Sequence, residues 1–289
     1  MDLIGIQIIQ VLSGIATLAL MGAGLAVIFG MMRVINFAHG EFMMLGGYVV
    51  IVCTEQFGIN LWIAMLIIAP IFVGLVGLVF ERILIRFLYG RMIDTLIATW
   101  GLSLFLIGVV TWIFGNVTRG VQTPLGAYSF GDYSEKVYTL VMIAFTVVIY
   151  LAIFIVLRRT KLGLIARGTM QNPNQASCLG VSPPRVYMVT FAVGAALTGL
   201  AGAILAPLNT VIPTIGVSYV AQAFITVITG GAAAFTGTVL ASGVFGTVRQ
   251  VISFEWTPIL GQVFLLITAV ILLRIFPTGI TGRFFRRST

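Results

Sequence analysis

Charged side chains are scarce in this sequence: 24 of its 289 residues are charged, 16 of them basic and 8 acidic. Soluble domains average about 25% charged and about 45–50% apolar residues, whereas this chain has 8% charged and 60% hydrophobic residues. So few charges cannot hydrate the surface of a soluble domain of this size, and the high hydrophobicity excludes a disordered chain. Most of the chain is therefore expected to lie in lipid.

Histidine and cysteine are also nearly absent, with one histidine and two cysteines in the whole chain. A lone histidine without a nearby cysteine offers too few ligands for a metal centre. The sequence also lacks an HExxH motif, a GxxxxGK[ST] phosphate loop and a convergent set of serine, histidine and aspartate. We therefore expect no enzymatic activity, no metal and no cofactor bound by this chain.

Long uncharged runs of 21 to 63 residues separate the charges. About 20 apolar residues cross a hydrocarbon core of about 30 Å, so the shorter runs each predict one span. The 63-residue run between Arg185 and Arg249 predicts three spans, or two with a re-entrant piece. Continuous rather than alternating hydrophobicity excludes lipid-exposed strands. The predicted fold is all-α, a single polytopic transmembrane helical bundle over 1–289 with eight to ten spans. We place the spans at 6–31, 41–57, 61–80, 94–115, 137–157, 186–207, 218–231, 236–252 and 257–275.

The distribution of basic residues predicts the orientation, because they mark the cytoplasmic ends of spans. Arg33 and the segments 82–91, 158–185 and 274–287 together hold 13 of the 16 basic residues. The N-terminus is therefore expected to be periplasmic, and not a cleaved signal peptide, and the C-terminus cytoplasmic. This bias explains most of the net charge of +8, so no nucleic-acid partner is expected. The residues predicted to lie outside are the acids Asp2, Glu55, Asp132, Glu135 and Glu255 and the bases Arg119, Lys136 and Arg249.

Small residues recur at four-residue spacing on several predicted spans. Such faces let helix backbones approach closely, so they predict tight packing and carry no information on substrate. Two of these faces are Gly22, Ala26 and Gly30 in the first span, and Gly194, Thr198, Gly202 and Ala206 in the sixth.

Residues 158–185 form the longest polar segment on the predicted cytoplasmic side, and they contain a short helix with a clear start and stop. Asn172 is placed to act as the N-cap, and Pro173 suits the first helical position. Gly180 suits a left-handed C-cap. The pattern predicts a helix over 173–179, which is too short to be stable in water unless it packs on something. A docking helix for a soluble partner and a well-capped connector both fit these features.

The segment 31–50 breaks the apolar pattern by placing Asn36, His39 and Glu41 between two hydrophobic runs. An ionisable group at membrane depth usually faces a bundle interior or a water-filled cavity. Broken backbone is tolerated there only where it lines protein or a cavity. The alternative is an interfacial turn in which His39 and Glu41 pair at the cytoplasmic boundary.

A second break, at 209–216, precedes the short predicted span 218–231. On that span Gln222, Thr226 and Thr229 recur at three- to four-residue spacing on one face. Such groups can line a path for an uncharged polar solute, or they can form interhelical hydrogen bonds, which is the commoner case.

In four segments the sequence resembles the permease subunits of branched-chain amino acid ABC importers and of their urea and short-chain amide relatives. These segments are INFAHGEFMMLGGYVV, ARGTMQNPNQASCLGV, ITGGAAAFTGTVLASGVFG and LLRIFPTGITGR, and the resemblance covers nearly the whole chain in order. It implies a multi-pass permease of the bacterial inner membrane that works by alternating access. The implied partners are membrane lipid, a second homologous permease, two cytoplasmic ATP-binding subunits and a periplasmic substrate-binding protein. ATP and Mg²⁺ would act on the partner subunits.

The resemblance also assigns candidate residues. The helix over 173–179 resembles the coupling helix that docks into a groove of an ATP-binding subunit. The candidate coupling residues are Arg167, Asn172, Pro173, Asn174, Gln175, Leu179 and Gly180. The candidate substrate-path residues are Asn36, His39, Glu41, Thr99, Gln222, Thr226 and Thr229.

Within this family, the segments 86–108 and 209–224 look more like the urea permeases. The predicted interior has almost no charge, which suits a neutral solute, whereas an amino acid zwitterion favours a paired charge or a helix end. We therefore expect urea or a short-chain amide as the substrate, with a branched-chain amino acid as the alternative. An ATP-independent channel or a secondary carrier is the rival class of transporter.

Overall fold

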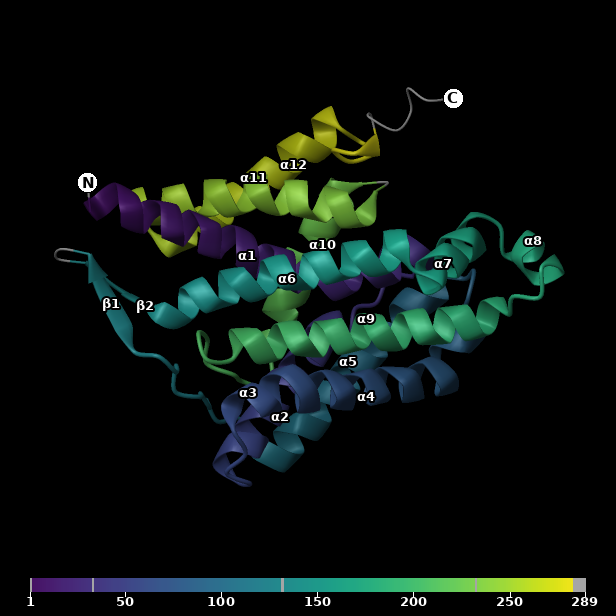
Figure 1. The fold of residues 1–289 in the computed structure, drawn as a ribbon, viewed down its shortest axis with the longest axis horizontal. Helices are drawn as coiled ribbons and strands as arrows, with labels where there is room; N and C mark the ends of the chain where they lie inside the picture. The colour runs from purple at the N-terminus through teal and green to yellow at the C-terminus, as the bar shows by residue number, and fades with distance from the viewer. Residues whose placement is uncertain (1, 33, 131–132, 232, 283–289) are drawn as a thin grey trace. The chain divides into compact units, whose positions relative to one another are not determined.

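The computed structural model describes residues 2–32, 34–130, 133–231 and 233–282, and it is almost entirely helical (Figure 1). Arg33, Asp132, Ala232, Arg283, Arg286 and Arg287, which entered the sequence analysis, lie outside the described residues. The helices of the first half are α1 (Asp2–Met32), α2 (His39–Glu55), α3 (Leu61–Ile63), the π-helix η1 (Ala64–Ile68), α4 (Ala69–Ile83), the 3₁₀-helix η2 (Ile85–Phe87) and α5 (Met92–Phe114). The second half has a hairpin of β1 (Ala127–Phe130) and β2 (Tyr133–Lys136), then α6 (Val137–Arg159), α7 (Lys161–Gln171), α8 (Pro173–Cys178), α9 (Pro183–Leu205), α10 (Ile215–Gly230), α11 (Ala234–Glu255) and α12 (Pro258–Ile275).

Each of the nine predicted segments coincides with a helix, and this confirms the all-α polytopic bundle. Among the described residues, six helices are long and apolar enough to cross a membrane. A seventh span arises if α10 and α11, which meet at an angle of 113°, count as one broken span. The total is below the expected eight to ten, because α2 has only 17 residues and because the sequence pattern cannot show the bend between α10 and α11. The orientation of the termini stays a prediction.

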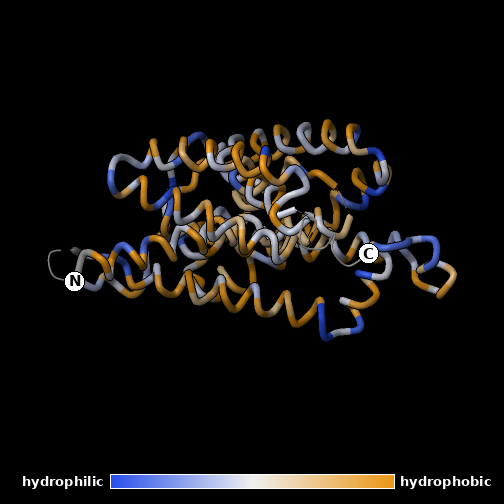
Figure 2. Tube along the Cα trace, turned by 90° about the horizontal axis from the view of Figure 1, so that it is seen from above, coloured by the Kyte–Doolittle hydropathy of each residue, from blue (hydrophilic) through white to orange (hydrophobic). Residues whose placement is uncertain are grey.

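The chain divides into two compact units. The first comprises residues 1–22, 122–147 and 221–289, and the second comprises 23–121 and 148–220. Much of the hydrophilic colour falls on the connections, while the helices are mainly hydrophobic (Figure 2). Many large apolar side chains are exposed, among them Trp112 at 86%, as expected where lipid replaces water as the solvent.

The core of the second unit forms where α2 packs on α9 and α4. Phe42 on α2 and Phe191 on α9 meet edge to face, with ring centroids 6.3 Å apart. The small-residue face of α9 is the contact surface, since a Cβ on Gly202 would lie 2.6 Å from the carbonyl carbon of Met43 on α2. The face predicted from the four-residue spacing is thus confirmed as a packing face.

The acids beside the first basic loop have local partners within the same unit. Asp94 lies 3.5 Å from Arg91 in an exposed ion pair, which contributes little to stability. The carboxylate of Glu81 accepts a hydrogen bond from the hydroxyl of Tyr89. Burial and this neighbouring carboxylate raise the pKa of the Tyr89 hydroxyl, so Tyr89 remains a hydrogen-bond donor at neutral pH.

Candidate functional site

The two breaks predicted from the sequence meet inside the second unit. The first lies between α1 and α2, and the second between α9 and α10. A Cβ on Gly216 would lie 2.7 Å from the carbonyl carbon of Gly40 and 2.8 Å from the amide nitrogen of Glu41. Only glycine allows two backbones to approach this closely, so α2 and α10 begin against each other.

Polar side chains hold the first break in place. The side-chain oxygen of Asn36 accepts from the amide of Ala38 at 3.0 Å. The hydroxyl of Thr99, on α5, accepts from the amide of Phe37 at 3.1 Å. Both side chains are fully buried, and a buried amide without a partner costs free energy. Asn36 and Thr99 therefore satisfy backbone amides that the break removes from a helix.

His39 is fully buried at the first position of α2. Its ring nitrogen Nδ1 lies 3.2 Å from the hydroxyl of Thr198 on α9. That hydroxyl donates its proton to the carbonyl of Gly194 at 2.7 Å. Thr198 therefore links the buried ring of His39 to the backbone of α9.

Glu41, the third residue of α2, is also fully buried. The hydroxyl of Ser103, on α5, interacts with its carboxyl group, but neither carboxyl oxygen has a partner with hydrogen-bond geometry among the described residues. Burying a carboxyl group without a hydrogen-bond partner costs free energy, so the burial of Glu41 favours a functional role for this residue. Four sequence-predicted residues, Asn36, His39, Glu41 and Thr99, thus lie around the first break.

Two further residues of this cluster, Ser103 and Thr198, were missed as site residues. Ser103 follows Thr99 by four residues, so both share one face of α5. Thr198 belongs to the small-residue face of α9, where it was interpreted only as packing. Same-face spacing was thus the available signal for Ser103.

The other candidate path residues lie on α10 in the first unit. Thr226 donates to the carbonyl of Gln222 at 2.7 Å, and the hydroxyl of Thr229 is buried without a hydrogen-bond partner in the described part of the chain. The side chain of Gln222 accepts from the guanidinium of Arg249, on α11, at 3.1 Å. Arg249 has no ion-pair partner among the described residues. The sequence analysis counted Arg249 only as a charge near the predicted outer face and missed its place beside Gln222.

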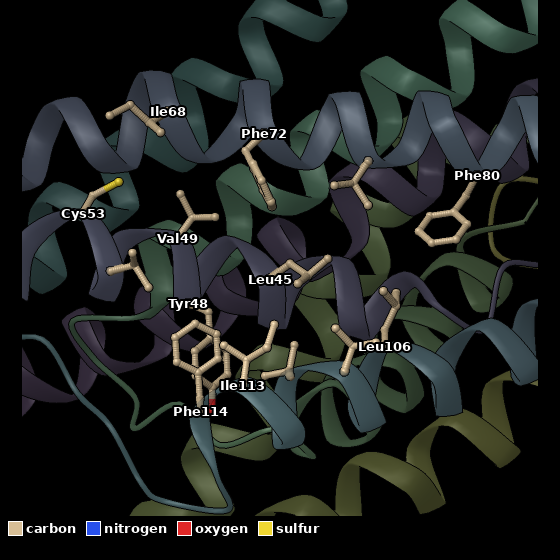
Figure 3. Close-up of a pocket in the computed structure, with 14 residues that line it drawn as sticks. Leu45, Tyr48, Val49, Cys53, Ile68, Phe72, Phe80, Leu106, Ile113 and Phe114 are labelled. Atoms are coloured by element: carbon tan, nitrogen blue, oxygen red, sulfur yellow. The ribbon is translucent and has the colours of Figure 1, made fainter. Parts of the chain in front are cut away.

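A cavity of about 500 Å³ lies between α2, α4 and α5 in the second unit. Figure 3 shows its lining, which is almost wholly aliphatic and aromatic and includes Leu45, Phe72, Leu106 and Phe114. Such a surface offers no hydrogen bonds to a polar solute. It therefore does not serve as the polar path.

The predicted docking helix is present as α8, at the end of the second unit (Figure 1). Asn172 caps it by accepting from the amide of Gln175 at 3.1 Å, and Pro173 is its first residue. Gly180 has a left-handed φ of 82°, as the C-cap prediction requires. Leu179, just before it, is 85% exposed. An exposed leucine thus follows the last turn of the helix, where it is a suitable contact for a partner.

Two more candidate coupling residues lie in or before this helix. Arg167, on α7, donates from Nε to the carbonyl of Gly163 at 3.3 Å, and Asn174 is exposed on α8.

Within the described residues no group of three or more His, Cys, Asp or Glu side chains could hold a metal ion.

Residues 7–273 match the family described as branched-chain amino acid transport system / permease component. This match spans most of the chain. The chain belongs to this permease family. Its relatives are permease proteins rather than enzymes, and it is accordingly a multi-pass protein of the inner, cytoplasmic membrane.

Three relatives illustrate the similarity. The chain is 30% identical to the high-affinity branched-chain amino acid transport system permease protein LivH of Escherichia coli K12, covering 93% of this chain and 92% of LivH. It is 29% identical to BraD of Pseudomonas aeruginosa, covering 96% and 95%. It is 25% identical to a probable LivH of Methanocaldococcus jannaschii, covering 92% and 88%.

A solved structure shares the fold. It is described as PsaBC from Streptococcus pneumoniae in complex with Fab, and it superposes with a TM-score of 0.50 over 97% of this chain and 94% of that one. The sequence identity is 14%, so this likeness concerns the fold alone.

Proposed function

We propose that this chain forms half of the translocation path of an ABC importer. A second homologous permease would complete the path, one of two ATP-binding subunits would dock at α8 of this chain, and a periplasmic protein would deliver the substrate. ATP and Mg²⁺ would act on the ATP-binding subunits. The family match over residues 7–273 and the exposed, capped helix α8 support this assignment.

We infer that the substrate is a branched-chain amino acid. The observation that carries this inference is the similarity, over more than nine-tenths of the chain, to permeases named for branched-chain amino acids. Glu41 agrees with it, since its carboxyl group is buried and has no ion-pair partner among the described residues, and an amino acid carries an ammonium group that such a carboxylate can bind.

Urea or a short-chain amide is the second candidate. Its support is the resemblance of segments 86–108 and 209–224 to urea permeases. A neutral amide would need only hydrogen bonds, which the hydroxyls of Thr99 and Ser103 on α5 can provide.

Uptake by the reconstituted importer separates the two substrates. Proteoliposomes holding both permeases and the ATP-binding subunits, supplied with the binding protein, should accumulate labelled leucine when ATP is present. Excess isoleucine or valine should suppress this accumulation, and excess urea should leave it unchanged. Accumulation of urea instead would replace the substrate, and leucine entry without the ATP-binding subunits would favour a channel or carrier.

Replacing Glu41 by glutamine should lower leucine uptake about tenfold or more, since a hydrogen bond to a charged group contributes roughly 1.5–3 kcal/mol. Glutamine keeps the shape but cannot carry the negative charge that would face the substrate ammonium. Uptake and the amount of protein in the membrane would both be measured, and only uptake should fall.

The matched control is Glu55→Gln, at the other end of α2. Glu55 pairs with Arg119 at 3.6 Å, and both side chains are partly exposed, so its loss should change uptake little. Normal leucine uptake by the Glu41→Gln variant would remove Glu41 from the substrate path.

A further inference from the structure

An apolar groove of about 270 Å³ lies in the second unit between the ends of α1, α6, α7 and α9. Branched aliphatic side chains dominate its lining, including Val27, Val156, Val189 and Val193. Arg185, in the first turn of α9, also lines it. The groove therefore combines a hydrocarbon-like interior with a cation at one end.

Basic residues gather around this groove without ion-pair partners in the described part of the chain. α6 ends with Arg158 and Arg159, and Lys161 follows at the start of α7. The sequence has no acidic residue between Glu135 and Glu255. Arg158, Arg159, Lys161 and Arg185 form no ion pair with the described residues. A negative group would therefore be attracted to this end of the groove.

Helix α7 has the character of a helix that lies in the membrane interface. Its apolar side chains Leu162 and Leu164 are 69% and 64% exposed, while Lys161 and Arg167 supply positive charge. Exposed leucines beside basic residues are typical of helices at the boundary between headgroups and acyl chains. This boundary is where a phospholipid headgroup would meet the basic residues.

The length of the groove agrees with an acyl chain. From Arg185 to Val193 it follows eight residues of α9, or about 12 Å at 1.5 Å per residue. One leaflet contributes about half of a hydrocarbon core of about 30 Å. A chain entering at Arg185 would therefore be covered over most of its depth in the leaflet.

We propose that this groove binds an anionic phospholipid, with one acyl chain against Val189 and Val193 and the phosphate at Arg185. The site stands next to α7 and α8, so bound lipid would hold α7 against the ends of α6 and α9. It does not depend on which solute is transported.

Lipid retention by the purified full-length chain tests this site. The probes are phosphatidylglycerol and phosphatidylcholine of equal chain length, added in a neutral detergent and followed by native mass spectrometry. Wild-type protein should retain phosphatidylglycerol in preference to phosphatidylcholine. Arg185→Gln should weaken this retention about fivefold, the contribution of one basic residue near an anionic surface.

Matched variants separate charge, shape and folding. Arg185→Lys keeps the charge, and Arg274→Gln removes a base from the last turn of α12 that does not line the groove; both should behave as wild type. Val189→Trp fills the groove and should reduce retention, although residue 189 is half exposed and the change should be tolerated.

Three outcomes would overturn the proposal. One is equal retention by the Arg185→Gln and Arg274→Gln variants. Another is displacement of the lipid by free glycerol phosphate, which would mean a site for a soluble anion. The third is complete loss of lipid when the ATP-binding subunits are added, which would make the groove part of their interface.

Discussion

Replacing Gly202 by valine should prevent this permease from accumulating in folded form. A Cβ at this position would overlap the carbonyl oxygen of Met43 and lie 2.6 Å from its carbonyl carbon. The obstacle is the backbone of α2 and cannot rotate away, so the cost should exceed the roughly 1–3 kcal/mol of ordinary overpacking. Because about 1.4 kcal/mol changes an equilibrium tenfold, folded protein should fall by more than about tenfold. Size-exclusion profiles of detergent extracts would measure this loss.

The same substitution at Gly101 is the control. Gly101 also lies within a helix, α5, but a Cβ there meets nothing within 4 Å. Gly101→Val should therefore accumulate close to the wild-type level. Equal amounts of the two variants would mean that α2 and α9 do not pack as closely as the structure indicates.

The contrast between these glycines shows what the sequence pattern could predict about the fold. Spacing on α9 predicted a packing face because small residues repeat every four positions. The partner of that face was not predictable, because one sequence carries no record of which helices meet. The 63-residue uncharged run predicted three spans, or two with a re-entrant piece, and the bend of 113° between α10 and α11 agrees with the second alternative. The position of the bend was not predictable, because it depends on packing and not on hydrophobicity.

The candidate site was predictable to a similar extent. Polar residues inside apolar runs identified Asn36, His39 and Glu41, because such residues are rare at membrane depth. The contact between Gly40 and Gly216 joins segments that lie far apart in the sequence, and neither segment predicts its contact with the other. The sequence analysis counted Arg249 only as a charge that indicates the orientation of the chain. Its hydrogen bond to Gln222, which joins α11 to α10, becomes visible only in the structure.

Replacing Leu179 by aspartate should nearly abolish transport while leaving the permease folded. Leu179 follows the last turn of α8 and is 85% exposed, so the fold of this chain gains little from it. If α8 docks into an ATP-binding subunit, this leucine is buried there, and burying a leucine contributes about 1.5–3 kcal/mol. A carboxylate in its place would add the cost of burying an unpaired charge. Uptake should fall more than about tenfold, and the ATP-binding subunits should no longer copurify with the permease.

Leu125→Asp is the matched control, because it makes the same chemical change at a loop residue that is 57% exposed and predicted to lie on the periplasmic side. Residue 125 has a positive φ of 75°, which aspartate tolerates well.

Asn172→Ala gives a graded second variant. Loss of the N-cap costs about 1 kcal/mol, so this change should weaken the coupling of ATP hydrolysis to transport by about fivefold. If Leu179→Asp transports normally and retains its ATP-binding subunits, α8 is a connector rather than the coupling helix. A loss of transport with both Leu179→Asp and Leu125→Asp would instead mean that the change acts through the fold, because Leu125 is predicted to lie on the side away from the ATP-binding subunits.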